Sequence, residues 1–429
     1  MINILLIFIG KFISSISRTF NLGNGSTWPG HIALSINKNF ITDLLKTSKT
    51  NTILIIGTNG KTTTTKLLQT ILEHTGKRVL INSSGANLLN GIASSLIIHA
   101  LLNARIKKDF AIFEVDENVF PAAALFIKPD FVIALNLFRD QLDRYGEIDT
   151  ISKKWKDSIK NLKNTNLILN SDDPQIAYLG KDVENVNYFG MESKSLENIT
   201  LEHSSDSLLC PNCGKKLSFS AYYFSHLGKW KCDNCGFKRP SPDITHTPFY
   251  PIPGTHAMYD VLASVLLAKK LKISNKVIEK SLRSFKPAFG RQEIIVSNGR
   301  QIQFFLSKNP TSFNESLKTI TSLNPKNLLI LLNDRIPDGT DVSWIWDIDF
   351  EKLLEKNTKL YVSGDRVYDL ALRLKYAGIS RENYKTFENI SDAINSGLTS
   401  TGANDTLYIL PTYSAMLEAR KILTGKKIL

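Results

Sequence analysis

The sequence predicts an α/β protein made of two parallel-sheet units with a small cysteine-bearing insertion between them. Three observations predict this class. Short apolar runs of strand length alternate with helix-like segments, a glycine-rich loop follows directly after the first apolar run, and four cysteines stand in two close pairs. The alternation is interrupted once, near the middle of the chain, where the cysteines lie.

The first unit is predicted for residues 46–290, after an N-terminal extension formed by residues 1–45. Its expected strands are continuous apolar runs, which are typical of a parallel sheet covered by helices on both faces. They occupy residues 53–56, 78–82, 110–115, 131–136 and 167–170, and a helix is expected at 66–73. The pattern breaks at residues 187–253, and an Ala- and Leu-rich helix is predicted afterwards at 257–271.

The second unit is predicted for residues 291–429. Expected strands at 328–332, 360–363 and 406–410 alternate with expected helices at 313–323, 367–375 and 414–423. Strands that alternate with helices indicate a Rossmann-like α/β domain.

Composition excludes several classes of protein. With 429 residues, 42% hydrophobic and 22% charged, the chain is neither disordered nor collagen-like, and four cysteines are too few for a disulfide framework. The longest apolar stretch, residues 4–9, is far shorter than the roughly 20 residues that span a bilayer, so we expect a cytoplasmic protein. The formal charge of +13 indicates anionic partners or a lysine-rich composition bias, and neither reading is favoured.

The first 20 residues place Lys11 and Arg18 among apolar clusters at roughly helical spacing. Such a helix either lies on a membrane surface or packs on the main domain. The second alternative is favoured, because no strongly charged face is visible.

A phosphate-binding loop is predicted at the end of the first strand. The apolar run 53–56 leads into Gly57, Thr58, Asn59, Gly60, Lys61, Thr62 and Thr63, and a helix follows. Glycines let backbone N–H groups approach phosphate oxygens, and the helix N-terminus adds partial positive charge. Lys61 is expected to reach the β- and γ-phosphates of a nucleoside triphosphate, and the Thr62 hydroxyl to complete a Mg²⁺ shell.

The four cysteines predict a structural zinc site. Cys210 and Cys213 form one C-x₂-C pair, Cys232 and Cys235 form another, and a glycine follows each pair. Four thiolates at this spacing match tetrahedral Zn²⁺, so a zinc ribbon of about 30 residues is expected at about 205–240. If all four bind zinc, no thiol remains for nucleophilic catalysis, and a reaction that uses ammonia needs that ammonia from another polypeptide.

The short phosphate loop, together with later motifs, resembles the Mur ligase superfamily, in which ATP phosphorylates a carboxylate and an amine displaces the phosphate. The resemblance implies a Mur ligase central-type ATPase domain. It makes Glu114 the Mg²⁺ ligand, with Glu117 as the alternative, and brings Arg291 to the nucleotide. Segments 170–174 and 253–256 resemble two further turns of the superfamily. Gln141 departs from it, because many members have a metal-binding His there.

An acidic tract at residues 331–349, with five Asp and two Trp, follows an expected strand of the second unit. With the ribbon and the stretch from Lys308 to Asn314, it narrows the resemblance to the Mur-ligase-like subunit of lipid II isoglutaminyl synthases. That family implies amidation of the D-glutamate α-carboxylate of lipid II, with ATP as substrate and ammonia from a class I glutaminase partner (GatD-like). It also implies nucleotide contacts from Asn333, and it makes Asp341 the carboxylate that completes the partner's Cys-His pair. A position at the inner membrane face would then be expected, without nucleic acid as a partner.

Two alternatives remain. One is a stand-alone amino-acid ligase. The other is a nucleic-acid-binding ATPase that uses the ribbon and its basic residues Lys229, Lys231, Lys238 and Arg239 with Trp230. Purely structural roles are favoured for four aspartates. Asp172 and Asp173 are expected to cap a helix. Asp347 and Asp349 are expected to form a local turn, with both tryptophans of the acidic tract in the core. Lys153 or Lys156 would be the place of a carbamylated Lys, if one exists.

Overall fold

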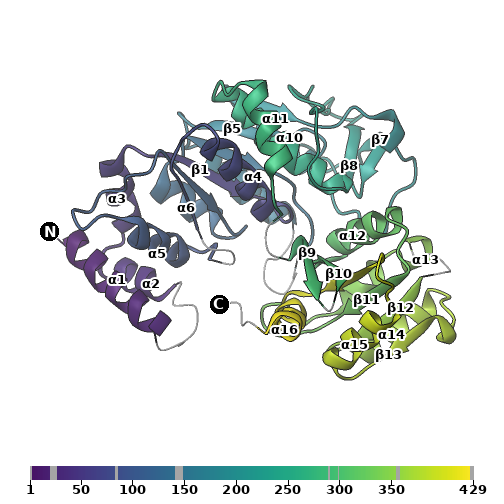
Figure 1. Cartoon of the computed structure of the whole chain (residues 1–429). Coiled ribbons are helices and arrows are strands. Elements are labelled where there is room, and N and C mark those ends of the chain that lie inside the picture. The colour runs from purple at the N-terminus through teal and green to yellow at the C-terminus, as the bar shows by residue number, and fades with distance from the viewer. Residues whose placement is uncertain are drawn as a thin grey trace.

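The computed structural model describes residues 2–19, 27–82, 86–140, 148–287, 290–297, 299–353 and 358–425. Figure 1 shows two α/β domains that meet along one side, with the N-terminal helices at the outer end of the first domain. The two predicted sheets and the separate two-stranded insertion are present. Among the described residues, no helix combines the length and the hydropathy needed to cross a bilayer.

The first sheet consists of six parallel strands in the order β2-β3-β1-β4-β5-β6. Their bounds are β1 (Asn51–Ile56), β2 (Val79–Ile81), β3 (Phe110–Glu114), β4 (Phe131–Ala134), β5 (Asn166–Asn170) and β6 (Val186–Phe189). Five of them lie where the sequence predicts strands. The sixth, β6, is a partly exposed edge strand whose residues lack a continuous apolar run. Because the strands are parallel, the loops after β1, β3 and β4 meet at one edge of the sheet.

Helices cover both faces of this sheet, as continuous apolar strands require. One face packs against α5 (Leu89–His99), α6 (Phe120–Ile127), α8 (Ile148–Ile159) and α9 (Pro174–Leu179). The other packs against α4 (Lys61–Glu73), α10 (Thr255–Lys270) and α11 (Asn275–Ser284). Helix α4 begins five residues before its predicted start, because its first turn consists of polar residues that carry no apolar periodicity.

The N-terminal helices are α1 (Ile2–Thr19), α2 (Trp28–Ile36) and α3 (Phe40–Ser48). Leu6 and Ile7 of α1 and Phe40 and Ile41 of α3 are buried in the same core as the first sheet. The favoured alternative, a helix that packs on the main domain, is therefore confirmed. Figure 1 shows α1 on the outside of this group, in purple.

The second sheet also has six strands, in the order β13-β12-β11-β14-β10-β9, and only the β9–β10 pair is antiparallel. The strands are β9 (Arg291–Ser297), β10 (Arg300–Phe305), β11 (Asn327–Leu331), β12 (Lys359–Ser363), β13 (Tyr384–Thr386) and β14 (Thr406–Pro411). The helices around it are α12 (Pro310–Ser322), α13 (Phe350–Leu353), α14 (Val367–Tyr376), α15 (Ile390–Ser400) and α16 (Tyr413–Thr424), with short 3₁₀ turns η2 (Ser343–Asp347) and η3 (Arg381–Asn383).

The insertion is a hairpin of β7 (Ser218–Phe224) and β8 (Leu227–Lys231), preceded by the 3₁₀ turn η1 (Lys194–Leu196). The turn after β5 holds it on the first domain. The Trp230 indole donates to the Ser171 carbonyl at 3.1 Å, and the Arg239 guanidinium donates to Asp172 at 2.6 Å. The hairpin is thus packed onto the domain through buried polar contacts.

Candidate functional site

The phosphate loop has the predicted form of strand, glycine-rich turn and helix. Gly57 and Gly60 have φ angles of +134° and +93°, a region that favours glycine. Gly60 is also required by space, since a Cβ there would lie 2.1 Å from the Asp260 carboxylate on α10. The loop therefore lies directly against α10, and its conformation depends on both glycines.

Residues that follow β4 hold the middle of this loop in place. Asn136 accepts from the Asn59 N–H at 2.9 Å and donates to the Asn59 carbonyl at 3.0 Å. The Thr58 hydroxyl accepts from the Phe138 N–H at 3.0 Å. These hydrogen bonds fix the loop conformation before any ligand binds. The backbone donors of the loop therefore need little rearrangement when a ligand binds.

Two pairs of contacting residues, each of which includes one glutamate, lie at the start of α4, where the end of β3 and the loop after it approach the helix. The Lys61 ammonium lies 2.9 Å from Glu117, and the Thr62 hydroxyl donates to Glu114 at 2.9 Å. Burial alone would raise the pKa of Glu117, but Lys61 and Lys308 outweigh it and lower that pKa. Burial instead raises the pKa of Glu114 against the opposing effects of Thr62 and Arg291.

This difference indicates which carboxylate suits a cation. Glu117 already has Lys61 as a charged partner, whereas the close partner of Glu114 is a hydroxyl. Hard divalent cations such as Mg²⁺ prefer oxygen ligands of this kind, a carboxylate beside a hydroxyl. The donor set of Thr62 and Glu114 therefore fits the predicted magnesium, and Glu117 fits the role of holding Lys61.

The second domain contributes to the same place. Lys308, just after β10, forms an ion pair with Asp140, and the Asn309 amide donates to the Asn59 side chain at 3.2 Å. Burial alone would lower the pKa of Lys308, but Asp140 and Glu117 outweigh it and raise that pKa. The two domains are thus joined directly at the phosphate loop.

A narrow cavity of about 60 Å³ lies beside the loop, between the domains. Asn59, Gly60 and Asp260 line it from the first domain, and Arg291 and Ser312 from the second. The predicted residue Arg291 therefore opens onto the same space as the phosphate loop. Among the described residues its guanidinium is the charged group that β9 directs to this space.

Two polar atoms at this cavity have no hydrogen-bond partner among the described residues: His256 Nδ1 and Gln292 Oε1. Burial, Arg291 and Lys318 lower the pKa of His256 to about 4, so its ring is neutral near pH 7. Buried unpaired polar atoms are costly. Because both atoms belong to residues that line the cavity, a polar ligand bound there would supply their missing hydrogen bonds.

Asn333 and Asp341 lie on the loop after β11. The Asn333 amide donates to the Ser414 hydroxyl at 3.1 Å and accepts from the Asp365 N–H at 2.9 Å, inside the second domain. Asp341 is exposed and accepts from the Ser343 N–H at 2.8 Å and the Ser343 hydroxyl at 3.0 Å. The structure therefore brings Arg291 and the phosphate loop together, while Asp341 lies on the exposed surface of the second domain.

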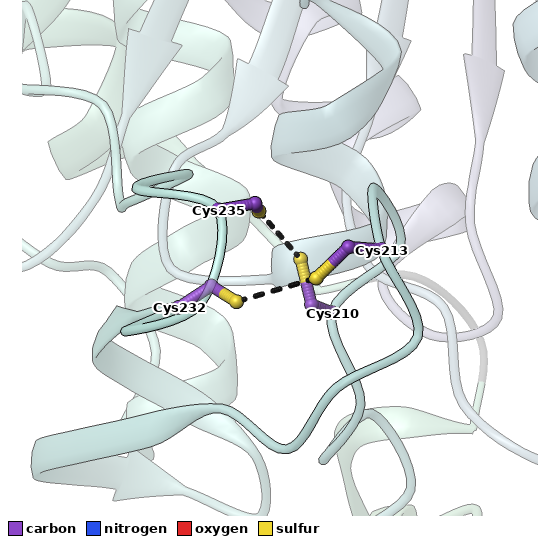
Figure 2. A group of neighbouring side chains, drawn as sticks. All are labelled: Cys210, Cys213, Cys232 and Cys235. Carbon is purple, nitrogen blue, oxygen red and sulfur yellow. Dashed lines mark hydrogen bonds between the residues drawn. The ribbon is translucent and has the colours of Figure 1, made fainter.

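The four cysteines converge at the end of the hairpin, as Figure 2 shows. Their sulfur atoms all lie within 4.8 Å of one another, with closest pairs at 3.5 Å and 3.7 Å. Tetrahedral zinc with bonds of about 2.3 Å would separate sulfurs by about 3.8 Å. The Asn212 amide contributes most to lowering the pKa of Cys235 to about 6, whereas burial raises the pKa of Cys210 to about 12. The donor set fits a structural metal.

The remaining predicted residues fall into three groups. Asp173 is the N-cap of α9, as expected, but Asp172 is a buried partner of Arg239 and of the Tyr259 hydroxyl at 2.7 Å, so its expected capping role was wrong. Gln141 lies outside the described residues. Lys156 donates to the Leu179 carbonyl at 3.1 Å at the end of α9, and Lys153 is exposed.

The last two carboxylates of the acidic tract contact residues of the first domain, Asp349 at 2.7 Å from His203, so the expected role of their side chains in a local turn was wrong. Asp349 is buried and its N–H donates to Asn314 at 2.9 Å, whereas Asp347 lies 3.4 Å from Arg139 of the first domain. Trp344 packs on Phe313, but Trp346 is largely exposed beside Tyr376, so only one of the two tryptophans lies where a core residue was expected.

Sequence reasoning missed Asn136, Asp140 and Asp260 as parts of the site. Asn136 and Asp140 directly follow the apolar run of β4, and position after a parallel strand was the available signal. Asp260 carried no such signal, because it lies within α10 and reaches the loop only through helix packing.

Two family models match the chain: Mur ligase middle domain over residues 55–268 and MurT ligase C-terminal over residues 306–416. The protein named "Lipid II isoglutaminyl synthase (glutamine-hydrolyzing) subunit MurT" from Streptococcus pneumoniae is 31% identical over 427 residues, covering 95% of this chain and 94% of the relative. The chain belongs to the MurT family. The protein of the same name from Staphylococcus aureus is also 31% identical, over 83% of this chain and 84% of the relative.

Solved structures of other ligases share the fold of this chain. A pseudomurein peptide ligase type C from Methanothermus fervidus superposes with a TM-score of 0.66 at 26% identity, covering 90% of this chain and 81% of that one. MurF from Acinetobacter baumannii, with a TM-score of 0.63 and 18% identity over 92% of this chain and 80% of its own, supports the fold alone. The expected Mur ligase fold and the expected Mur-ligase-type enzyme are confirmed.

Proposed function

We propose that this chain is the ligase subunit of a two-subunit enzyme that amidates the D-glutamate α-carboxylate of the lipid II stem peptide to D-isoglutamine. ATP activates the carboxylate as an acyl phosphate, and ammonia comes from a class I glutaminase partner. The observation that carries this proposal is the phosphate loop, with its Lys61–Glu117 and Thr62–Glu114 pairs, facing Arg291 and Lys308 of the MurT-type second domain.

In the first step a carboxylate oxygen attacks the γ-phosphorus, the bond to the β,γ-bridging oxygen breaks, and ADP leaves. The N–H groups of residues 57–63 and the N-terminus of α4 bind the phosphates. Glu117 keeps the Lys61 ammonium in place until phosphate oxygens replace it as partner. Arg291, from across the cavity, adds positive charge where negative charge develops.

Thr62 and Glu114 would hold Mg²⁺, which when bound neutralises charge on the β- and γ-phosphates. Cys210, Cys213, Cys232 and Cys235 would hold a structural Zn²⁺ in a zinc ribbon, with no part in the chemistry. Within the fold predicted for residues 46–290, this ribbon would stiffen the hairpin that packs on the turn after β5.

In the second step ammonia attacks the carbonyl carbon of the acyl phosphate, and phosphate leaves. Ammonium, which dominates in neutral water, has no free electron pair, so a sheltered supply of ammonia is favoured. We assign Asp341 to the partner's Cys-His pair, as the carboxylate that orients the imidazole. Its exposure and its fixation by Ser343 support this role, as do the exposed Ile336 and Trp346 on the same loop and turn.

Asn333 is proposed to act on the nucleotide indirectly. The hydrogen bonds of its side-chain amide hold Ser414 and the start of the turn at Asp365, so it shapes the loop after β11. The enzyme would work in the cytoplasm at the inner membrane face, where a substrate on a polyprenyl pyrophosphate anchor is found.

The nucleic-acid alternative is weakened by the ribbon contacts. Trp230 is only 3% exposed and cannot stack on bases. Lys229 lies 2.7 Å from Glu197, and Arg239 is paired with Asp172. The stand-alone ligase is disfavoured by the similarity of the whole chain to MurT subunits.

The test is amidation of lipid II by this chain with ATP, with and without a class I glutaminase. With ammonium chloride the chain alone should amidate lipid II, and with glutamine it should do so only when the glutaminase is present. An amino acid that replaces ammonia as nucleophile would instead establish a stand-alone ligase.

A further inference from the structure

Helix α1 is apolar on two opposite faces. Leu6, Ile7 and Gly10 face the body of the domain and are buried. Leu5, Phe8 and Phe12 lie on the opposite side and are 57%, 60% and 61% exposed. Their spacing of three and four residues places them in one stripe along the helix. A helix that is apolar all round is normally buried all round, but among the described residues nothing covers the outer stripe.

The body of the domain holds α1 firmly. The Asn3 amide donates to Asp43 of α3 at 3.2 Å and accepts from Asn37 at 2.9 Å. Gly10 lies so close to α5 that a Cβ there would be 2.8 Å from Ile97. The stripe is therefore presented by a fixed helix, and only its outer face is available to a partner.

The charged residues before α3 are basic, and Asp43 of α3 is an acidic side chain that contacts α1. Residues 1–42 contain no Asp or Glu but include Lys11, Arg18 and Lys38. Burial, Lys108 and Lys11 lower the pKa of His99, which shows that basic groups gather beside the helix. Trp28, at the start of the neighbouring α2, adds a large exposed aromatic side chain. An apolar stripe with a basic surround is complementary to an anionic lipid surface.

We propose that the outer stripe of α1, formed by Leu5, Phe8 and Phe12, inserts into the surface of an anionic phospholipid bilayer. The helix then lies in the plane of the interface, while Lys11 meets lipid phosphates. The stripe from Leu5 to Phe12 spans about 10 Å at 1.5 Å per residue, enough for peripheral and reversible attachment. The stripe would be the part of the chain that attaches it to the membrane in the proposed function. The inference rests on that function only for its biological use.

The experiment measures binding of the full chain to vesicles of phosphatidylglycerol and phosphatidylcholine, compared with phosphatidylcholine alone, by cosedimentation. The wild-type chain should bind the anionic vesicles more strongly. Phe8→Ser with Phe12→Ser should lower the apparent partition coefficient at least about tenfold. The control, Leu125→Ser with Ile199→Ser, removes two apolar side chains elsewhere that are more exposed, at 67% and 90%, and should change binding less than about twofold.

A second variant keeps the inference testable if the double substitution impairs folding. Lys11→Glu leaves the stripe intact and should weaken binding to anionic vesicles at least about fivefold, with little effect on neutral ones. Absence of wild-type binding, or equal binding by the stripe variant, would overturn the proposal. So would a wild-type dimer in sedimentation velocity without lipid that the stripe variant converts to a monomer, because a second copy would then cover the stripe.

Activity separates this inference from the proposed function. Amidation of lipid II in detergent micelles tests the proposed function alone, and the stripe variant should keep its wild-type rate there. Amidation of lipid II embedded in anionic vesicles should fall with binding. A stripe variant with the wild-type rate on vesicles would contradict the inference, and a wild-type chain inactive in micelles would contradict only the proposed function.

Discussion

Both sheets are built mainly from parallel strands, but the acidic residues near their carboxyl ends differ in solvent exposure. At the carboxyl end of β3 in the first sheet, Glu114 and Glu117 are buried and paired with residues of the phosphate loop. After β11 of the second sheet, Asp341 is exposed and bonded only to the nearby Ser343 among the contacts described. Burial suits charges that meet a nucleotide, whereas exposure suits a carboxylate that another protein must reach. In the proposed function, Glu114 and Glu117 serve chemistry within the chain, and Asp341 serves a partner.

The largest effect is expected at the exposed carboxylate of the second domain. Asp341→Asn should reduce glutamine hydrolysis by the chain–glutaminase complex by up to about 10⁴-fold, because an amide cannot hold the partner's imidazole in the required tautomer. The measurement is glutamate release at saturating glutamine. Ammonia-dependent amidation should be unchanged, and Asp392→Asn, an exposed aspartate on α15, is the control.

Loss of both glutamine- and ammonia-dependent activity in Asp341→Asn would contradict this division, because it would place Asp341 in the ligase reaction.

The reciprocal effect is expected at the buried pairs of the first domain. Lys61→Ala should lower ammonia-dependent amidation and ATP hydrolysis by about 10²- to 10³-fold, since one preorganised cationic donor to the phosphates is lost. Glutamine hydrolysis by the partner should be retained. The control is Lys77→Ala, an exposed lysine after α4. An active Lys61→Ala variant would remove the phosphate loop from the account.

The attachment of the insertion to the first domain is expected to have the next largest effect. Asp172→Asn removes the buried carboxylate partner of Arg239 and leaves it paired with the more exposed Glu192, so it should lower the free energy of unfolding by about 3 kcal/mol. Asp157→Asn is the control, because this aspartate on α8 is exposed and pairs with the exposed Lys160, so its loss should change stability by less than about 1 kcal/mol. Chemical denaturation measures both, and equal effects would show that the Asp172–Arg239 pair is unimportant.

The smallest effect is expected at the cysteines. Cys232→Ser should abolish bound zinc, measured by elemental analysis, and lower the free energy of unfolding by about 2 kcal/mol. The effect is limited because Trp230 and Arg239 still hold the hairpin on the domain. ATP hydrolysis should persist. A wild-type chain purified without any metal at one equivalent would refute the zinc assignment.

Much of the fold was predictable because its physical signals are local. Continuous apolar runs identified β1 and β3, and the run from Gly57 to Thr63 identified the phosphate loop by the needs of its backbone. The β9–β10 hairpin was not predicted, since β9 exposes Ile294 and Val296 and lacks the apolar run of a buried strand. Local sequence patterns therefore predict buried parallel strands well and partly exposed edge strands poorly.

The site was predictable in part for the same reason. Thr62 lies at the start of α4 and Glu114 at the end of β3, and both places were recognisable in the sequence. In the structure the Thr62 hydroxyl lies 2.9 Å from the Glu114 carboxylate. The contacts of Lys308 with Asp140 and of Asn309 with Asn59 join positions about 170 and 250 residues apart. No local pattern contains such pairs, because they depend on how the two domains pack.

The central claim is that this chain activates a carboxylate with ATP and takes its nitrogen from a companion. The most direct measurement is amidation of lipid II with amide-¹⁵N glutamine, in the presence and absence of a class I glutaminase, followed by mass spectrometry. The account predicts ¹⁵N in D-isoglutamine only when the glutaminase is present, with one ATP consumed for each amide formed. Incorporation of ¹⁵N by the lone chain, or amidation without ATP consumption, would contradict it.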